Sequence, residues 1–240
     1  MDQVRFQDRA LPLKALEAPG GGLVHAWFLD LSELASPVSD ATHSGPRQER
    51  ATRRFYLRLL LGAYLGLPGK AVRINRMRRG KPVLDRTHHA DRLEFSMAAS
   101  RGYCLIGITM QNPIGVDLEP AGRQARQPRA LAHRYFSADE QKALSAVEDR
   151  DLARAFMHTW ACKEAVVKAA GHGIANQLCR FTVCTDPREA PRIKSIDGDD
   201  PARWSLRMLN PTEGLLGAVA VRHPEMRIEG FRLRPVEGAR

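Results

Sequence analysis

The run Phe156-Met-His-Thr-Trp-Ala-Cys-Lys-Glu-Ala-Val-Val-Lys-Ala-Ala-Gly171 carries the clearest structural pattern in this chain. Drawn at about 100° per residue, its apolar side chains fill one broad arc, which predicts an amphipathic core helix over 151–170. Glu164 and Lys168 lie together at the edge of the arc, one turn apart. Lys163 falls inside the arc, where an ammonium group must either reach outward to water or meet an anion. Taken structurally, the pattern describes only a core helix with one surface Glu to Lys pair.

Helices and strands alternate irregularly on either side of this run. Two further helices are predicted at 49–66 and 137–144, the second opening on the capping box Ser137-Ala-Asp-Glu140. Turn residues separate short strands predicted at 93–97, 103–109, 114–119, 180–184, 204–209 and 215–222. The strands 103–109 and 114–119 can pair as an antiparallel hairpin. The irregular alternation indicates an α+β fold.

Length and composition place the chain among folded globular proteins. Its 240 residues, 43% hydrophobic and 27% charged, allow one large domain or two small ones and exclude a collagen-like or wholly disordered chain. The longest apolar run, 57–67, is interrupted by Arg58 and two glycines, and no secretory signal opens the chain. We therefore expect no membrane span and a cytoplasmic location. The four cysteines form no CxxC pair and are expected to be reduced core residues: Cys104, Cys162, Cys179 and Cys184.

The formal net charge of +10 indicates an anionic partner, which leaves nucleic acid, an acidic protein, a phosphorylated small molecule or a membrane surface. Arginine supplies 30 of the 37 basic residues and lysine only 7. Three of these scarce lysines, Lys81, Lys163 and Lys168, fall in segments that other patterns single out. Since Arg and Lys are not interchangeable around phosphate, this coincidence favours a phosphate site.

The segment Gly115-Val-Asp-Leu-Glu-Pro120 places two carboxylates on one face of a strand. Strand alternation puts Val116 and Leu118 on one side and Asp117 and Glu119 on the other. Two like charges side by side are unfavourable without a cation, and Mg²⁺ commonly binds one or two carboxylates together with water or phosphate. The alternative is a polar outer face at the end of a strand.

Two basic segments could contact phosphates. The turn Gly80-Lys81-Pro82 presents one lysine after the basic run 76–79. Arg50 and Arg54 lie one turn apart on a predicted helix and therefore share a face. Both segments can equally be solvated surface.

The order and spacing of these segments resemble the surfactin-type (Sfp-type) 4′-phosphopantetheinyl transferase family. The residues that carry the resemblance are G-K-P at 80–82, G-V-D-L-E at 115–119, R-Y-F-S-A-D-E at 134–140 and W-A-C-K-E-A-V-V-K at 160–168. The resemblance runs from about residue 47 to residue 223. It implies two pseudo-symmetric α/β halves, 1–112 and 113–240, with the active site in the cleft between them and the metal site in the second half. It also implies the reaction, in which the phosphopantetheine arm of coenzyme A moves to a serine of a carrier protein and adenosine 3′,5′-bisphosphate leaves.

The resemblance further implies roles for individual residues. Asp117, Glu119 and Glu164 are expected to share Mg²⁺, with Mn²⁺ as an alternative ion. Glu164 is also the expected general base on the carrier serine, kept ionised by the metal and the flanking lysines, while Lys168 faces the leaving diphosphate. The residues expected to contact coenzyme A are Arg50, Arg54, Lys81, Pro82, Ser100, Lys163 and Lys168.

One position departs from the family pattern. Members usually carry a Ser-His pair after G-K-P, whereas this chain has Phe95-Ser-Met-Ala-Ala-Ser100, with Ala99 in place of the histidine. The loss of one charge-assisted hydrogen bond to the 3′-phosphate, typically about 1.5 to 3 kcal/mol, predicts weaker coenzyme A binding. A nearby basic side chain could substitute, the candidates being His88, His89, Arg92 and Arg101.

Two other functional classes remain open from the sequence. A family member that has lost turnover and acts as a carrier-protein or coenzyme A binding protein would explain Ala99. Nucleic-acid binding would explain the net charge, but no zinc finger, helix-turn-helix or aromatic-rich binding signature accompanies it. We therefore expect an acidic apo carrier protein and coenzyme A as partners, no nucleic acid and no membrane, and a monomer.

Overall fold

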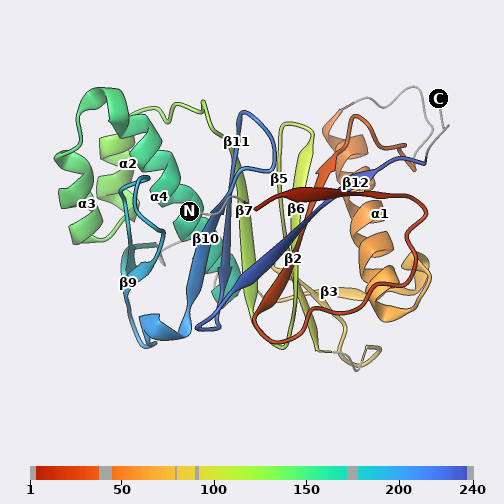
Figure 1. Ribbon diagram of the computed structural model, residues 1–240. Coiled ribbons are helices and arrows are strands. Elements are labelled where there is room, and N and C mark those ends of the chain that lie inside the picture. The colour runs from red at the N-terminus through yellow and green to blue at the C-terminus, as the bar shows by residue number, and fades with distance from the viewer. Residues whose placement is uncertain (1–3, 38–44, 79, 90–91, 172–177, 237–240) are drawn as a thin grey trace.

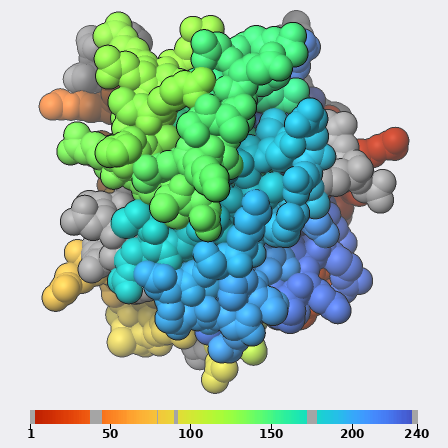
Figure 2. Space-filling model, turned by 90° about the vertical axis from the view of Figure 1, so that its left-hand side faces the viewer, coloured from red at the N-terminus to blue at the C-terminus, as the bar shows by residue number. Residues whose placement is uncertain are grey.

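The computed structural model describes residues 4–37, 45–78, 80–89, 92–171 and 178–236. Two β-sheets lie in the middle of the molecule, with helix α1 on one side and helices α2, α3 and α4 on the other (Figure 1). Figure 2 views the side on which α2 and α3 lie above the region of β8 to β10. This mixture of sheets and helices confirms the predicted α+β class.

The larger sheet has five strands in the order β1-β12-β2-β6-β5. Their bounds are Phe6–Ala10 for β1, Arg227–Arg234 for β12, Leu23–Asp30 for β2, Tyr103–Met110 for β6 and Leu93–Ser100 for β5. The last strand of the chain, β12, runs parallel to β1 and β2 and lies between them. A division of the chain at residue 112 therefore does not separate the two sheets, because β12 comes from the second half and completes the first sheet.

The smaller sheet is antiparallel and has the order β10-β11-β7. Its strands are β10 Ser205–Leu209, β11 Leu215–Val221 and β7 Ile114–Pro120. The predicted hairpin between β6 and β7 is wrong, because β6 pairs with β2 and β5, whereas β7 pairs with β11. The hairpin is instead β5–β6, where Arg101 (φ 49°) and Gly102 (φ 80°) supply the two left-handed residues of a tight turn.

Helix α1 packs on the larger sheet and α4 on the smaller one, while α2 and α3 pack against α4. Their bounds are α1 Pro46–Leu65, α2 Pro128–Tyr135, α3 Ala138–Ser145 and α4 Asp149–Ala170. The capping box predicted for α3 is confirmed: the Ser137 hydroxyl accepts from the Glu140 amide, and the Glu140 carboxylate accepts from the Ser137 amide. Smaller elements complete the fold: strands β3 Ile74–Arg76, β4 Pro82–Leu84, β8 Phe181–Val183 and β9 Ile193–Ile196, and 3₁₀ helices Gly69–Ala71, Leu178–Arg180 and Pro201–Arg203.

Separate apolar clusters fill the spaces between these layers. One joins α1 to the larger sheet, a second lies between the two sheets, and a third holds α4 against the smaller sheet. Three of the cysteines are buried as expected, but Cys179 is exposed. Among the residues that the structure describes, none of the helices is both long and apolar enough for a membrane span.

Candidate active site

Strand β7 presents its two faces to different layers. Val116 and Leu118 belong to the apolar cluster between the sheets, as strand alternation predicts. The other face turns toward α4: the Asp117 carboxylate meets the Lys168 ammonium of that helix, Oδ1 to Nζ, at 2.7 Å. The strand and the distant helix predicted from the sequence therefore come together at this point.

Asp117 is buried with one oxygen unpartnered. Its side chain is 7% exposed, and Oδ1 accepts the Lys168 hydrogen bond. Oδ2 is buried and has no hydrogen-bond partner among the described residues. A buried carboxylate oxygen left without a donor or a cation is costly. This atom therefore marks a position where a ligand could complete the contacts.

Glu164 lies beside the same lysine, with its Oε2 4.0 Å from Lys168 Nζ. Burial raises the pKa of the Glu164 carboxyl to about 7; Lys168 offsets part of the rise, and the negative charges of Asp117 and Glu119 add to it. A carboxylate whose pKa lies near neutrality can take a proton from a hydroxyl group and release it again. The negative charges of Asp117 and Glu119 thus contribute to the raised pKa of Glu164, although burial is the larger cause.

The third predicted acid has its own partner. Glu119 Oε2 pairs with Arg123 Nη1 at 2.7 Å. Over the described ranges, no three side chains of Asp, Glu, His or Cys are grouped closely enough to hold a metal ion. The oxygen donors and the orphaned Asp117 Oδ2 suit a hard divalent cation. The three carboxylates are not gathered around one point in this arrangement, so their convergence stays a prediction.

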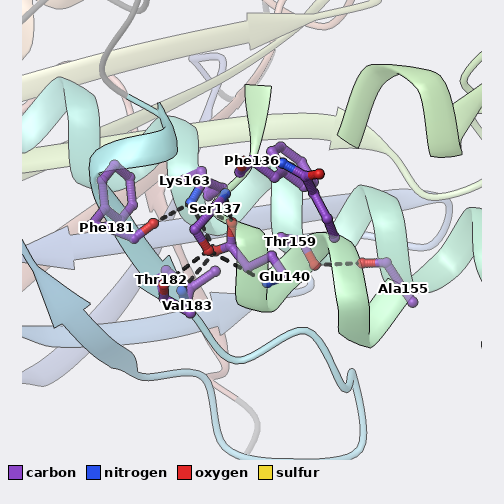
Figure 3. Close-up of polar contacts among 10 residues, drawn as sticks. Phe136, Ser137, Glu140, Ala155, Thr159, Lys163, Phe181, Thr182 and Val183 are labelled. Carbon is purple, nitrogen blue, oxygen red and sulfur yellow. Dashed lines mark hydrogen bonds and ion pairs between the residues drawn. The ribbon is translucent and has the colours of Figure 1, made fainter. Parts of the chain in front are cut away.

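Lys163 of α4 is buried and points toward Glu140 and the Phe181 carbonyl (Figure 3). Its side chain is 0% exposed, and Nζ is 2.7 Å from both carboxylate oxygens of Glu140. The ammonium also donates to the Phe181 carbonyl at 2.6 Å and lies 4.1 Å from the centre of that ring. The anion that the helical pattern required is therefore a buried glutamate, and the expectation that Lys163 contacts coenzyme A is wrong for this arrangement.

The Glu140 carboxylate accepts four hydrogen bonds from three donors. Besides Lys163, its carboxylate accepts from the amides of Ser137 and Val183, at 2.9 and 2.7 Å. The capping box was a visible signal for Glu140, but its second role required knowing that α3 and β8 pack against α4. Because Lys163 points here, of the two lysines only Lys168 stands beside Glu164, which corrects the expectation that both lysines keep Glu164 ionised.

The Lys81 ammonium also forms hydrogen bonds with groups of the protein itself. Its ammonium donates to the Ile114 carbonyl at 3.0 Å and to the Ala169 carbonyl at 3.4 Å. Burial lowers the pKa of Lys81, and Glu94 offsets part of that effect. Pro82 follows directly as the first residue of β4. The expected contact of Lys81 with a coenzyme A phosphate stays a prediction.

The arginines of α1 offer a second basic surface. Arg50 and Arg54 are exposed and line one surface hollow together with Arg47. The sequence analysis missed Arg53, whose Nε is buried and has no hydrogen-bond partner among the described residues. Its charge acts on the Cys104 thiol, lowering a pKa that burial raises to about 12. The adjacent pair of arginines at 53 and 54 was the only signal for it.

The charge of Arg53 thus acts on the strand pair that carries the position departing from the family pattern. Cys104 is the register partner of Ala99 in the β5–β6 pair, and Ser100 is the register partner of Tyr103 at the end of β5. The two histidines considered as substitutes are engaged elsewhere: His89 Nε2 accepts from the Arg73 amide at 2.8 Å, and the His88 ring lies 3.1 Å from Asp85.

Comparisons with known proteins point to one family. The model of the 4′-phosphopantetheinyl transferase superfamily matches residues 113–220, which contain β7 and α4. The 4′-phosphopantetheinyl transferase HetI of Nostoc sp. is 32% identical over 213 residues, covering 82% of this chain and 87% of that protein. A 4′-phosphopantetheinyl transferase of Bacillus subtilis is 26% identical over 211 residues, covering 82% of this chain and 89% of that protein.

A solved structure also matches part of the fold. It is a holo-(acyl-carrier-protein) synthase from Bacillus anthracis in complex with CoA (3′,5′-ADP), 21% identical with a TM-score of 0.36, covering 45% of this chain and 93% of that one. On the strength of the sequence relatives, the chain belongs to the 4′-phosphopantetheinyl transferase superfamily. The enzyme class expected from the sequence is thereby confirmed.

Proposed function

We propose that this enzyme transfers the 4′-phosphopantetheine arm of coenzyme A to a serine of an apo carrier protein. The serine oxygen attacks the phosphorus that bears the pantetheine arm, its proton is taken up, and the bond to adenosine 3′,5′-bisphosphate breaks. The observation that carries this proposal is the meeting of Asp117, Glu164 and Lys168 in a family member whose Glu164 has a pKa of about 7.

Each of the three side chains has a distinct role in the proposed reaction. Glu164 takes the serine proton directly or through one water molecule; its pKa of about 7 belongs to the protein without a metal ion, and a bound cation would lower it and keep the carboxylate ionised. Lys168 places a positive charge beside the diphosphate as negative charge develops on the leaving group. Asp117 holds the Lys168 ammonium at 2.7 Å and so fixes its direction.

We further propose that Asp117 and Glu164, with Glu119 as a third donor, hold Mg²⁺ or Mn²⁺ when coenzyme A is bound. The support is chemical: oxygen donors, an orphaned buried Oδ2, and a glutamate whose pKa neighbouring acids raise. When bound, the ion neutralises charge on the diphosphate oxygens. Lys168 lies among these acids and keeps part of their charge compensated in the metal-free protein.

Arg50, Arg53 and Arg54 are the proposed contacts for the phosphates of coenzyme A. Arg53 is the strongest of the three, because a buried guanidinium nitrogen without an acceptor favours an anion beside it. Its charge acts on Cys104, the register partner of Ala99, so Arg53 is the proposed replacement for the donor that the family histidine supplies. Ser100, at the end of the same strand, stays in the proposal as an additional hydroxyl contact.

The proposed partner is an acidic carrier protein, because the net charge of +10 attracts an acidic surface over a long range. All the residues named above belong to one chain, which supports action as a monomer.

The decisive experiment incubates the purified protein with coenzyme A, Mg²⁺ and several apo carrier proteins, followed by intact mass measurement. We expect a phosphopantetheine adduct on at least one carrier, and none when EDTA replaces Mg²⁺. Calorimetry with coenzyme A provides a separate binding readout. Tight coenzyme A binding without an adduct on any carrier would favour the noncatalytic binding function instead.

A further inference from the structure

Lys81 joins two elements that carry the proposed catalytic acids. It precedes β4 and donates to the carbonyl of Ile114, the first residue of β7, and to that of Ala169, in the last turn of α4. The carbonyls of a last helical turn lack partners within the helix, and a cation there is favoured by the helix dipole. In the described part of the chain Lys81 forms no ion pair with an acid. These two carbonyls are therefore its principal partners.

The two elements approach unusually closely at the same place. A Cβ atom on Gly115 would lie 1.9 Å from the Ala165 carbonyl oxygen and 2.4 Å from the Ala169 amide nitrogen. Only glycine lets the backbone of β7 come so near the backbone of α4. Gly115 follows Ile114, and Ala169 supplies the second Lys81 contact, so the lysine lies at the point of closest approach.

The spacing at this point determines the spacing of the active site. Asp117 is two residues beyond Gly115 on the same face of β7, and Lys168 precedes Ala169 on α4. The hydrogen bond between Asp117 and Lys168 is 2.7 Å long, so a small separation of strand and helix would break it. Glu164, on the same helix, would move away from the acids of β7 in the same step.

The hairpin that carries Lys81 is itself fixed against the end of α4. The Met77 amide donates to the Lys81 carbonyl at 2.9 Å, and Gly80, with a φ of 89°, closes the turn. A Cβ on Gly171, the residue that ends α4, would lie 3.5 Å from the Met77 sulfur and terminal methyl. Met77 is 46% exposed, and its side chain lies beside this helix end.

We propose that Lys81 is a positioning residue that clamps the start of β7 to the end of α4, and so holds Asp117, Glu164 and Lys168 in register. This role differs from the coenzyme A contact expected from the sequence. It rests on the proposed function only where it concerns catalysis, because the clamp itself is a property of the protein without substrates.

The test compares Lys81→Met with Lys142→Met, a matched change at an exposed lysine of α3. Three quantities are measured: kcat and KM for transfer, the Kd of coenzyme A by calorimetry, and hydrogen exchange of peptides covering 114–120 and 160–171. We expect Lys81→Met to lower kcat by at least about 10-fold, since small displacements of reacting groups cost that much or more. The Kd of coenzyme A should stay within about 3-fold, and both peptides should exchange faster than in Lys142→Met.

The outcomes separate the clamp from its alternatives. A Kd for coenzyme A raised about 10-fold or more with unchanged exchange would assign Lys81 to the phosphates and overturn the proposal, as would no change in any quantity. If the wild type transfers to no carrier, the proposed function fails, while the exchange measurement still decides the clamp. If Lys81→Met does not fold, Lys81→Arg is measured instead. Its guanidinium group is longer and planar and cannot take the position of the ammonium between the two carbonyls, so faster exchange is again expected and unchanged exchange contradicts the clamp.

Discussion

Helix α4 meets carboxylates on two different sides, and the two clusters differ in how fully their polar atoms are partnered. On one side, Lys163 and Glu140 are enclosed, and both oxygens of Glu140 accept two hydrogen bonds each. On the other, Asp117 keeps a buried oxygen that no described residue partners, and Glu164 has a pKa raised to about 7. A complete network specifies structure, whereas an incomplete one is where a ligand is expected to complete it.

The largest effect is expected from replacing Glu164, which belongs to the cluster whose polar atoms are incompletely partnered. Glu164→Gln should lower kcat by about 100-fold to 10,000-fold, because a general base contributes on that order and the metal also loses a donor. The fold should persist, since glutamine has nearly the same shape and a charge that burial disfavours is removed. Steady-state kinetics and chemical unfolding test both statements. The control is Glu148→Gln, at the exposed start of the same helix. A nearly normal kcat would remove Glu164 from both proposed roles.

Breaking the buried ion pair between Lys163 and Glu140, in the fully partnered cluster, should mainly lower the stability of the fold. Lys163→Met or Glu140→Leu alone leaves one buried charge unpaired and should lower the free energy of unfolding by about 3 to 5 kcal/mol. The double variant should lose clearly less than the sum of the two, which a denaturant-unfolding cycle measures. Arg180→Met, which breaks an exposed pair with Asp197, should cost about 1 kcal/mol or less. Additive losses would show that the two charges do not stabilise each other.

The pH dependence of stability should report the raised pKa of Glu164. Because the pKa of Glu164 is raised from 4.5 to about 7, the folded protein binds more protons than the unfolded chain between these values. The free energy of unfolding in EDTA should therefore fall as pH rises from about 4.5 to 7, by up to about 3 kcal/mol, and then level off. Glu164→Gln should flatten this slope, and Mg²⁺ should restore stability above pH 7. Equal slopes in the two proteins would contradict the assignment.

The smallest expected effect concerns the spacing between strand and helix. Gly115→Ala places a methyl group against backbone atoms of α4, which cannot rotate away, and should lower the free energy of unfolding by about 1 to 3 kcal/mol. Gly20→Ala, where a Cβ has no neighbour within 4 Å, should change it by less than about 0.5 kcal/mol. Thermal unfolding of the two variants makes the comparison. If Gly115→Ala has the same free energy of unfolding as the wild type, β7 and α4 can separate without loss of stability.

Several parts of the fold could be predicted from local patterns. The helices at 49–66 and 137–144, the capping box and the core helix rest on hydrophobic period and end signals, and each is present within a few residues. The pairing predicted for β7 was wrong, because the pattern of residues within a strand does not show which neighbouring strand it pairs with. Strand β12 was missed altogether, and its place between β1 and β2 depends on parallel contacts across most of the chain.

The amino-acid sequence by itself determined the alternation that puts Asp117 and Glu119 on one face of a strand, the helical spacing of Glu164 and Lys168, and the family, because these follow from the order of residues within short segments. Only the tertiary structure decided that Lys163 turns to Glu140, that Arg53 Nε is buried with no acceptor among the described residues, and that Lys81 binds two carbonyls from distant elements. Burial and pairing between remote segments set these roles, and both depend on how the layers pack.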